Sequence, residues 1–393
     1  MVPPSIGSVV AGSCLAVLGA RIHPAPASPT IEDGVVLVCD GRIAAVGERG
    51  RVDVPESAGR LDARGLSLTY GFWNSHVHFT EEAVANAGSL EASRLEDHLQ
   101  EMLTRWGFTT VVDTASFLGN TQRIRERIRA GEVAGPEILT AGAGLYPPNG
   151  VPYYVKDAIP PEVAASLPQP ATAAEAAEIV RTNLEGGADL TKVFVVSWVA
   201  RGKTLPMPLE IVKTAAAETH SRGKLLIAHP SMTEGIVLAL EGGVDILAHS
   251  IEDPENLDDA LIRRLVDAKM SLVPTLELFS PFGDIDAILE ALGRFSRAGG
   301  QVLFGTDVGY RPDDDPTEEY ELMKRAGLSF DEILASLTTV PAERFGQLDR
   351  KGTVEPGRQA DLVLLEGDPR EDIRSLARVR YTVREGRIIW NRR

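Results

Sequence analysis

The pattern of apolar and polar positions separates the two ends of the chain from its middle. Residues 35–46 form two apolar runs joined by an Asp-Gly pair, which is typical of a tight hairpin. Residues 361–365 predict another strand, and residues 381–390 predict a second hairpin around a Glu-Gly pair. Because both ends favour strands, we expect them to form one small β-sandwich with a different domain inserted between them.

The middle of the chain, about residues 66–340, alternates short apolar runs with amphipathic helical stretches, a pattern typical of strand–helix units around a parallel sheet. Eight candidate strands result, at residues 66–73, 109–113, 137–141, 190–195, 225–229, 245–249, 271–276 and 302–307. Eight parallel strands close into a barrel. The predicted fold class is therefore α/β, a (β/α)8 TIM barrel with a small β-sandwich domain built from both termini. We assign residues 63–344 to the barrel, and residues 1–62 and 345–393 to the sandwich.

The overall composition narrows the class of partner. A length of 393 residues suits a barrel of roughly 250 residues plus a smaller module. Hydrophobic residues at 44% and charged residues at 24% are typical of a globular protein, which excludes disordered and fibrous classes. The net charge of -16, without a long run of Lys or Arg, argues against nucleic acid, so we expect a small-molecule partner. No stretch reaches the ~20 apolar residues of a membrane span.

The cysteines and the N-terminus bear on the cellular compartment. Cys14 and Cys39 are too few for a disulfide framework or a thiolate metal site, which fits a reducing compartment. Residues 6–20 are apolar and small, and residues 11–14 faintly resemble a bacterial lipoprotein cleavage site. No Lys or Arg precedes Arg21, however, whereas a secretory signal begins with a positive region. We therefore expect a cytoplasmic protein and disfavour export or lipid attachment.

A long Pro-rich segment, residues 145–170, interrupts the rhythm after the third predicted strand and contains three tyrosines: Tyr146, Tyr153 and Tyr154. Loops of this length without regular structure are usually functional lids or disordered segments. The alternative, a tolerated surface insertion, stays open.

Four of the seven histidines fall at the C-terminal ends of predicted strands: His76, His78, His229 and His249. That end of a (β/α)8 barrel is where active sites are found. Imidazoles that converge inside a barrel would be costly without a partner, because branched apolar side chains normally fill it, and a metal ion removes that cost. We interpret the other three histidines as surface residues: His23, His98 and His220.

Two further polar residues belong to this candidate site. Asp307 ends the eighth predicted strand as a buried carboxylate that needs a cation or a donor beside it. With imidazoles it makes a mixed N/O site suited to Zn, Mn, Ni or Co, although a helix N-cap is the alternative role. Lys192 lies inside the fourth strand, where metal ions would repel its ammonium. Either the side chain faces away, or its amine is modified.

Several motifs carry a resemblance to a known family. They are residues 71–78 with the sequence Gly-Phe-Trp-Asn-Ser-His-Val-His, Lys192 on the fourth strand, residues 228–229, 247–250 and 305–307, and the closing segments 341–346 and 352–363. Together they resemble the amidohydrolase superfamily, in the group related to imidazolonepropionase and prolidase-like peptidases. The resemblance covers nearly the whole chain beyond about residue 15.

The resemblance implies two divalent metal ions, Zn first, with Mn, Co or Ni as alternatives. The implied ligands are His76, His78, Lys192, His229, His249 and Asp307. The first two histidines and the aspartate would hold the more buried ion, and the last two histidines the more exposed one. The lysine, carboxylated by carbon dioxide, would bridge both. A hydroxide between the metals would be the nucleophile, with the aspartate as general base and then general acid.

The implied reaction is hydrolysis of an amide or peptide-like C–N bond, in an N-acyl amino acid, an Xaa-Pro-type dipeptide or a cyclic amide. The alternatives are a mononuclear deaminase, or a lactone or carbamate hydrolase, on the same fold. A non-catalytic scaffold is disfavoured because all six ligand positions are filled. Relatives in this family are often homo-oligomers, which we keep as an alternative to a monomer.

Two departures from the group leave the substrate open. Asn74 stands where the group usually has an acidic residue, and Pro230 follows His229 where the group has glycine. No counterpart is found of the tyrosine that some relatives place after strand four. The candidates for substrate binding are therefore Tyr146, Tyr153 and Tyr154.

Overall fold

The computed structural model describes residues 14–281, 284–311 and 313–392. The first three residues of the segment that resembles a lipoprotein cleavage site, 11–13, lie outside this range. No helix in the described part of the chain is long and apolar enough to cross a membrane.

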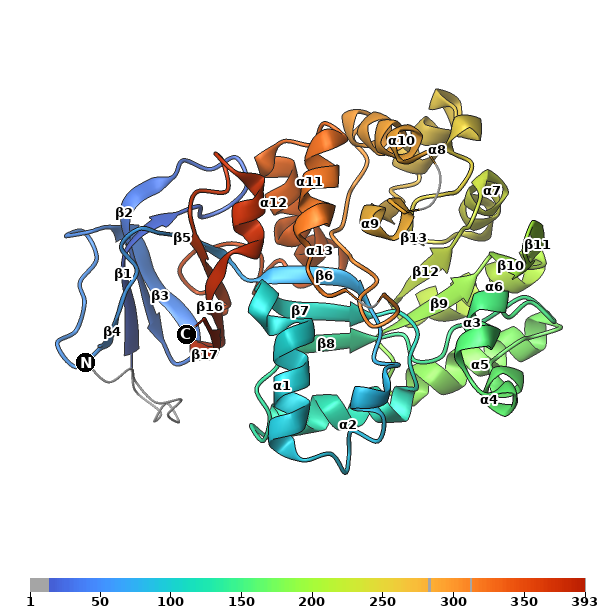
Figure 1. Ribbon diagram of the computed structural model, residues 1–393, viewed down its shortest axis with the longest axis horizontal. Coiled ribbons are helices and arrows are strands. Elements are labelled where there is room, and N and C mark those ends of the chain that lie inside the picture. Colours follow the sequence, from blue (N-terminus) through green and yellow to red (C-terminus); the bar gives the residue numbers. More distant parts are fainter. Residues whose placement is uncertain (1–13, 282–283, 312, 393) are drawn as a thin grey trace.

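One eight-stranded sheet is built from both ends of the chain (Figure 1). Its N-terminal strands are β1 (Cys14–Ile22), β2 (Ile31–Cys39), β3 (Arg42–Glu48), β4 (Gly59–Asp62) and β5 (Leu66–Tyr70). Its C-terminal strands are β15 (Leu362–Glu366), β16 (Val379–Arg384) and β17 (Arg387–Asn391). The two groups meet where β5 pairs antiparallel with β15. This arrangement confirms the predicted sandwich sheet from both termini.

Both predicted hairpins of this sheet form, because their turn residues adopt left-handed backbone conformations. Asp40 and Gly41 between β2 and β3 have φ of 50° and 75°. Glu385 and Gly386 between β16 and β17 have φ of 49° and 75°. Two successive positive φ angles are the requirement of the type I′ turn, whose twist matches that of paired strands.

The sheet has two packed faces, as β15 shows. Leu362 and Leu364 enter the core of the sandwich, where they join residues of the N-terminal strands. Val363 and Leu365 point to the other face and join the core that the sheet shares with the barrel helices. Since successive side chains of a strand point to opposite faces, this one strand contributes to both cores.

A ring of parallel strands forms the second part of the molecule. The sheet β6-β7-β8 contains Phe72–Val77, Phe108–Asp113 and Glu137–Thr140. The sheet β9-β12-β13-β14 contains Leu190–Phe194, Leu225–His229, Ile246–Ala248 and Ser271–Val273. The predicted eighth strand is an extended segment, which closes the ring through bonds from Leu303 N to Leu272 O (2.9 Å) and from Ser75 N to Phe304 O (2.7 Å). These elements confirm the predicted (β/α)8 barrel.

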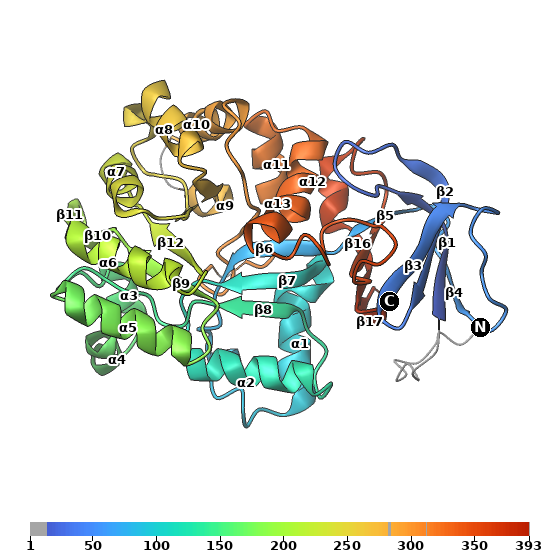
Figure 2. The same ribbon diagram turned by 180° about the vertical axis from the view of Figure 1, so that it is seen from behind.

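The helices form a layer outside the strands (Figures 1 and 2). Their bounds are α1 (Ala92–Met102), α2 (Leu118–Arg129), α5 (Ala173–Glu185), α6 (Leu209–His220), α7 (Thr233–Gly242), α8 (Asp259–Asp267), α10 (Ile285–Arg297), α11 (Thr317–Arg325), α12 (Phe330–Leu337) and α13 (Thr339–Arg344). Their buried residues follow helical spacing, as with Ile288, Leu292 and Phe295 of α10. The sequence therefore packs one apolar stripe of such a helix against the strands.

The remaining elements are short. After β8 the chain forms α3 (Tyr153–Ala158) and α4 (Pro161–Ser166), so the Pro-rich segment that we expected to lack regular structure contains two helices. After β9 it forms the hairpin of β10 (Val196–Ala200) and β11 (Lys203–Pro206), and after β14 it forms α9 (Leu276–Phe279). The 3-10 helices among the described residues are η1 (Glu82–Val84), η2 (Thr104–Trp106), η3 (Pro254–Asn256) and η4 (Ile373–Ala377).

Two predicted strands differ from the structure. The predicted strand 66–73 is two strands, because the chain passes from the sandwich sheet to the barrel at Gly71. A Cβ at Gly71 would lie 2.3 Å from Thr109 Oγ1, so only glycine fits this crossing. The predicted strand 271–276 ends at Val273, and Thr275 then turns the chain into α9. The boundaries at residues 62 and 345 stay a prediction, and the sandwich sheet itself continues to Tyr70.

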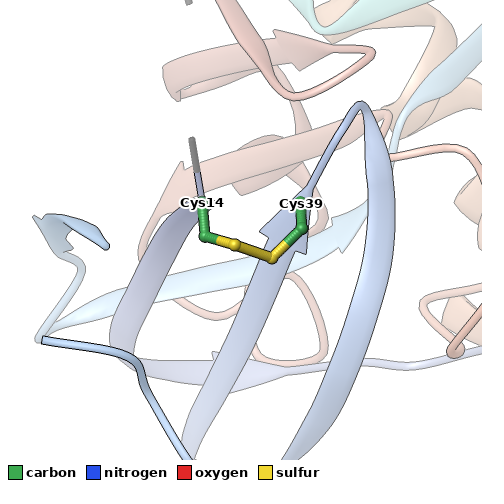
Figure 3. Close-up of a disulfide and its surroundings, with 2 residues drawn as sticks. All are labelled: Cys14 and Cys39. Carbon is green, nitrogen blue, oxygen red and sulfur yellow. A yellow bond between two sulfur atoms is a disulfide. The ribbon is translucent and has the colours of Figure 1, made fainter. Parts of the chain in front are cut away.

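The two cysteines, which we took to be too few for a disulfide framework and to fit a reducing compartment, form a single disulfide. Cys14 and Cys39 face each other across the β1–β2 pair, with 4.3 Å between their Cα atoms (Figure 3). A disulfide removes the support that the cysteines gave to a reducing compartment. The cytoplasmic location therefore stays a prediction without that argument.

Candidate metal centre

Five of the six predicted ligands lie at the C-terminal ends of barrel segments, and Lys192 lies in the middle of its strand. His76 is on β6, and His78 follows it directly. Lys192 is on β9, His229 ends β12, His249 follows β13, and Asp307 lies in the closing segment. In a barrel these positions face one end of the interior, so side chains far apart in the sequence converge there.

The closest group consists of His76, His78 and Asp307. The two Nε2 atoms are 3.2 Å apart, and Asp307 Oδ1 lies 3.1 Å from His76 Nε2 and 2.9 Å from His78 Nε2. Although these contacts are short, Oδ1 accepts no hydrogen bond of acceptable geometry. His76 and Asp307 are almost completely buried. Three polar atoms therefore meet at a place where two of the side chains are buried and that of His78 is 14% exposed.

The tautomer of His78 shows what this meeting requires. Its Nδ1 lies 3.0 Å from the carbonyl oxygen of Ala115, an acceptor, so Nδ1 carries a proton and, in the form that binds a metal ion, Nε2 presents a lone pair. That lone pair then faces the carboxylate of Asp307, and two lone pairs at 2.9 Å repel each other. Ligands bound to one ion at about 2.0–2.2 Å are about 3 Å apart, so a divalent ion fits these residues.

His249 extends the group. One donor atom from each of His76, His249 and Asp307 lies within 4.8 Å of the other two. The ring centroid of His249 is 4.4 Å from that of His76 and 4.7 Å from that of His229. Its Nδ1 is 2.8 Å from the hydroxyl of Thr275, which leaves Nε2 for another partner. His229 lies at the edge of the cluster, stacked on Phe194 with 4.8 Å between ring centroids.

The backbone is strained at this site. His249, Thr275 and Asp307 have φ of 81°, 45° and 62°, a region that residues with side chains rarely adopt. Such strain concentrates at functional sites, where the surrounding structure enforces it. Gly305 is required nearby, because a Cβ there would lie 2.3 Å from Val273 and 3.0 Å from the Cβ of His76.

Burial controls the protonation of the histidines. Desolvation lowers the pKa of His76 to about 3, although the negative charge of Asp307 opposes this shift. Desolvation also lowers the pKa values of His229 and His249 well below their ordinary value, with the charge of Lys192 as a further cause in both. At neutral pH these imidazoles are therefore neutral, the form that binds a metal ion.

Lys192 is buried at the same end of the barrel. Its Nζ lies 5.2 Å from the ring centroid of Phe194, and it forms no ion pair within the ranges that the structure describes. Desolvation lowers the pKa of Lys192 to about 7, partly offset by the charge of Asp307. About half of the amine is therefore neutral, and nucleophilic, near pH 7.

The three candidate tyrosines take different places. The hydroxyl of Tyr154, on α3, lies 3.5 Å from His229 Nε2, so the Pro-rich segment reaches the site. Tyr153 packs edge-on against Tyr154, with 5.5 Å between ring centroids. Tyr146 is buried behind Phe194, stacked at 4.4 Å. Of the three, Tyr154 is the one in contact with a predicted ligand.

The interpretation of the other three histidines is wrong for one of them. His23 is buried, with its ring 5.3 Å from that of Phe330, because the loop after β1 is covered by α12. His98 is partly buried beside Glu81, and His220 is exposed beside Asp245. These contacts lie away from the metal centre, and give the three residues structural roles.

Sequence reasoning missed the residues that support the ligands. Asn74 joins two strands: its Oδ1 accepts from the backbone N–H groups of His76 and Thr306 at 3.2 Å each, and its Nδ2 donates to Thr306 Oγ1 at 2.8 Å. The amide thereby holds both segments that carry the His76–Asp307 contact. No pattern in the sequence indicated this role, because the two partners are 232 positions apart.

A second support is Asp113, at the end of β7. Its carboxylate accepts hydrogen bonds from the hydroxyls of Ser116 (2.5 Å), Thr121 (2.9 Å) and Thr140 (2.7 Å). These bonds fix the turn that presents the carbonyl of Ala115 to His78. The position at a strand end was the one available indication for Asp113.

Comparison with known proteins identifies the family. Residues 68–389 match the family described as the amidohydrolase family. The chain belongs to the amidohydrolase family. Among the relatives of this amidohydrolase, the imidazolonepropionase of Cupriavidus metallidurans is 26% identical, with 85% of each chain covered. The superfamily resemblance and the relation to imidazolonepropionase are thereby confirmed.

Other relatives of this amidohydrolase carry different names. The adenine deaminase of Deinococcus deserti is 26% identical over 89% of this chain and 56% of its own, so this chain spans just over half the length of that relative. The ochratoxinase of Aspergillus niger is 23% identical over 88% of this chain and 79% of its own. A solved Xaa-Pro dipeptidase with bound methionine superposes with a TM-score of 0.81 at 20% identity, over 96% of this chain and 100% of that one. That structural likeness shows a shared fold.

Proposed function

We propose that this amidohydrolase is a metal-dependent hydrolase that cleaves an amide or peptide-like C–N bond. The substrate class would be an N-acyl amino acid, an Xaa-Pro-type dipeptide or a cyclic amide. The observation that carries the proposal is the meeting of His76 Nε2, His78 Nε2 and Asp307 Oδ1 within 3.2 Å of one another, where Oδ1 accepts no hydrogen bond. The Xaa-Pro dipeptidase among the structural neighbours supports an amide substrate.

The proposed ligands divide between two ions. His76, His78 and Asp307 would hold the more buried ion, and His229 and His249 the more exposed one, with Zn as the first choice and Mn, Co or Ni as alternatives. When bound, the metal ions would supply an activated water molecule and would polarise the scissile carbonyl group. The neutral state of the three buried imidazoles supports this role.

We propose that Lys192, carboxylated to a carbamate, would be a ligand of both ions. Carbon dioxide adds to a neutral amine, and burial gives Lys192 such an amine near neutral pH. The neutral amine would form an N–C bond to carbon dioxide and release one proton to solvent, and the product would be an anion that offers two oxygen ligands in place of an ammonium that the metal ions would repel. The parallel pairing of β9, which carries Lys192, with β12, which ends at His229, supports the proposed bridge.

Two residues would handle the substrate. Asp307 would accept the proton of the attacking water and donate it to the leaving amine, which departs poorly as an anion. Tyr154 would hydrogen-bond to a polar group of the substrate, since burial raises the pKa of its hydroxyl well above the ordinary value and keeps it protonated. Its place in the segment 145–170 would make that segment a lid over the site.

A second candidate is a mononuclear deaminase. The set His76, His249 and Asp307 is a compact group for a single ion, and an adenine deaminase is among the relatives. In that case Lys192 would hold no metal. The two candidates therefore differ in the number of ions and in the role of one residue.

The deciding experiment counts metal ions per chain in the purified protein and in Lys192→Ala. The proposal predicts two ions in the wild type and a loss of at least one in the variant. A single ion that the substitution leaves in place would favour the deaminase. A screen of N-acyl amino acids, dipeptides, lactones, carbamates and adenine on the metal-loaded protein then assigns the reaction. Inactivity of the two-metal protein on every amide would refute amide hydrolysis.

A further inference from the structure

We infer that Glu319 is a positioning residue for the metal centre, which it serves by holding the turn that orients His249. The inference rests on the proposed function, in which His249 binds a metal ion. Glu319 lies on α11, outside the barrel, and its carboxylate bonds to the backbone of α9. The connection runs through Thr275, whose hydroxyl is the partner of His249 Nδ1 at 2.8 Å.

The first step is the conformation of Thr275. The residue has φ of 45° and ψ of 52°, the left-handed region, which is a genuine outlier for a β-branched side chain. It is fully buried and directly precedes α9. A residue with an unfavourable backbone conformation keeps it only where neighbouring contacts enforce it.

The second step is the start of α9. At the position of Thr275 a hydroxyl ordinarily caps the helix by accepting a hydrogen bond from one of its first N–H groups. Thr275 makes no such bond, because its hydroxyl faces His249. The first N–H groups of the helix need another acceptor, since unpaired buried N–H groups are costly.

Glu319 is that acceptor. Its Oε1 accepts from the N–H of Leu276 at 2.9 Å, and its Oε2 accepts from the N–H of Glu277 at 2.8 Å. The residue is completely buried, an expensive position for a carboxylate. Both bonds go to the two peptide groups directly after Thr275, so they fix the turn on which its hydroxyl sits.

Glu319 therefore caps the helix, and Thr275, at the N-cap position, orients His249 instead. Glu319 takes over the capping of a four-residue helix, which is too short to stabilise itself. Thr275 is left free to bond to His249 Nδ1, and that bond leaves Nε2 as the ligand atom and fixes the plane of the ring. The capping carboxylate of α11 thus acts on the metal site from 70 positions beyond His249 in the sequence.

The experiment measures metal affinity by chelator competition, together with the visible spectrum of the Co²⁺-loaded protein. The variants are Glu319→Gln, Thr275→Val and the double variant. The amide of Gln offers one acceptor and turns its NH₂ toward the second N–H group. Val keeps the shape of Thr but removes the hydroxyl. We expect each single variant to weaken the binding of one metal equivalent by about 10–100-fold and to change the spectrum.

The double variant shows whether Glu319 acts on metal binding through Thr275 or whether the two residues act independently. If Glu319 acts through Thr275, the metal affinity of the double variant equals that of whichever single variant binds the ion less tightly. Multiplied losses would overturn the inference. Glu321→Gln is the matched control, because this carboxylate is exposed on the same helix, and it should bind metal like the wild type.

Two further outcomes are distinguished. A Glu319→Gln protein that unfolds at a lower temperature but binds both ions with wild-type affinity and spectrum overturns the inference, because its role is then only structural. If that variant does not fold, Glu319→Asp takes its place, and unchanged metal affinity in the folded Asp variant also overturns the inference. His249→Ala tests the proposed function separately. Should it leave metal binding unchanged, the ligand set is wrong, whatever the Glu319 variants show.

Discussion

A buried lysine at the junction of the two cores offers a sharp test of how the fold is held. Lys351 is completely buried, and its Nζ lies 2.9 Å from Glu137 Oε2, 3.1 Å from Asp361 Oδ2 and 2.8 Å from the hydroxyl of Thr110. Glu137 begins β8 of the barrel, and Asp361 directly precedes β15 of the sandwich. The ammonium thus joins both parts of the molecule.

Replacement of Lys351 by Met keeps the apolar stem and leaves two carboxylates without their main counterion. Removal of one partner of a buried ion pair costs about 3–5 kcal/mol. For a chain of this size that loss corresponds to a fall in melting temperature on the order of 5 °C. Metal binding should be unchanged, because the cluster surrounds the N-terminal ends of the barrel strands, opposite the metal centre.

The pH dependence supplies a second readout. Burial raises the pKa of Glu137, but the charges of Lys351 and Arg350 lower it by more, to about 2. Because the folded-state pKa is depressed, its stabilisation is present above the ordinary pKa of about 4.5 and is lost as the pH falls through about 2. The variant should lose much of this dependence.

The assay is equilibrium unfolding in urea at pH 7, repeated across pH 2–5, with metal content measured in parallel. Arg350→Met is the matched control: Arg350 also pairs with Glu137, but its side chain is 40% exposed, so its loss should cost about 1 kcal/mol or less. A Lys351→Met protein within about 1 kcal/mol of the wild type would refute the reasoning.

Three further predictions address the disulfide, the lid and the lysine. Cys39→Ser should lower the free energy of unfolding by at most about 3.5 kcal/mol in urea titrations, because the closed loop spans 25 residues, and should leave metal content unchanged. Tyr154→Phe should raise KM more than it lowers kcat on whichever amide proves to be the substrate, and equal kcat and KM to the wild type would remove Tyr154 from the site. For metal-free protein, reconstitution with Zn²⁺ and bicarbonate should speed up as the pH rises through about 7, where the amine of Lys192 becomes neutral, and Lys192→Ala should show no bicarbonate dependence.

The fold could be predicted because its determinants are local and periodic. Apolar runs at regular spacing give the barrel strands, and the two Asp-Gly-like turns give hairpins whatever surrounds them. Strand ends also located the candidate ligands, because one end of a barrel collects them. The division of the predicted strand 66–73 at Gly71 was not predicted, since it depends on a contact with Thr109 that forms only once the strands are packed.

The supporting residues could not be predicted either, because their contacts also form only once segments distant in the sequence have packed together. The pairing of Cys14 with Cys39 is a matter of register between β1 and β2, and no local pattern in the sequence fixes that register. Asn74 is a departure from the expected acidic residue, and its role became clear only from its bonds to Thr306. An amide can donate to one strand and accept from another at once, whereas a carboxylate only accepts.

Backbone strain and electrostatic repulsion both destabilise the metal centre in the absence of bound ions. Three residues with side chains hold left-handed backbones there, His249, Thr275 and Asp307, and each such conformation costs of order 1–3 kcal/mol. The lone pair of His78 faces the carboxylate of Asp307 at 2.9 Å, which adds repulsion. The whole stability of a protein is only about 5–15 kcal/mol, so a fold that carries both costs in one place must recover them from bound ions or from rigid support. Asn74, Asp113 and Glu319 are that support, and each acts on backbone or hydroxyl groups behind a ligand, which keeps the ligand atoms themselves free.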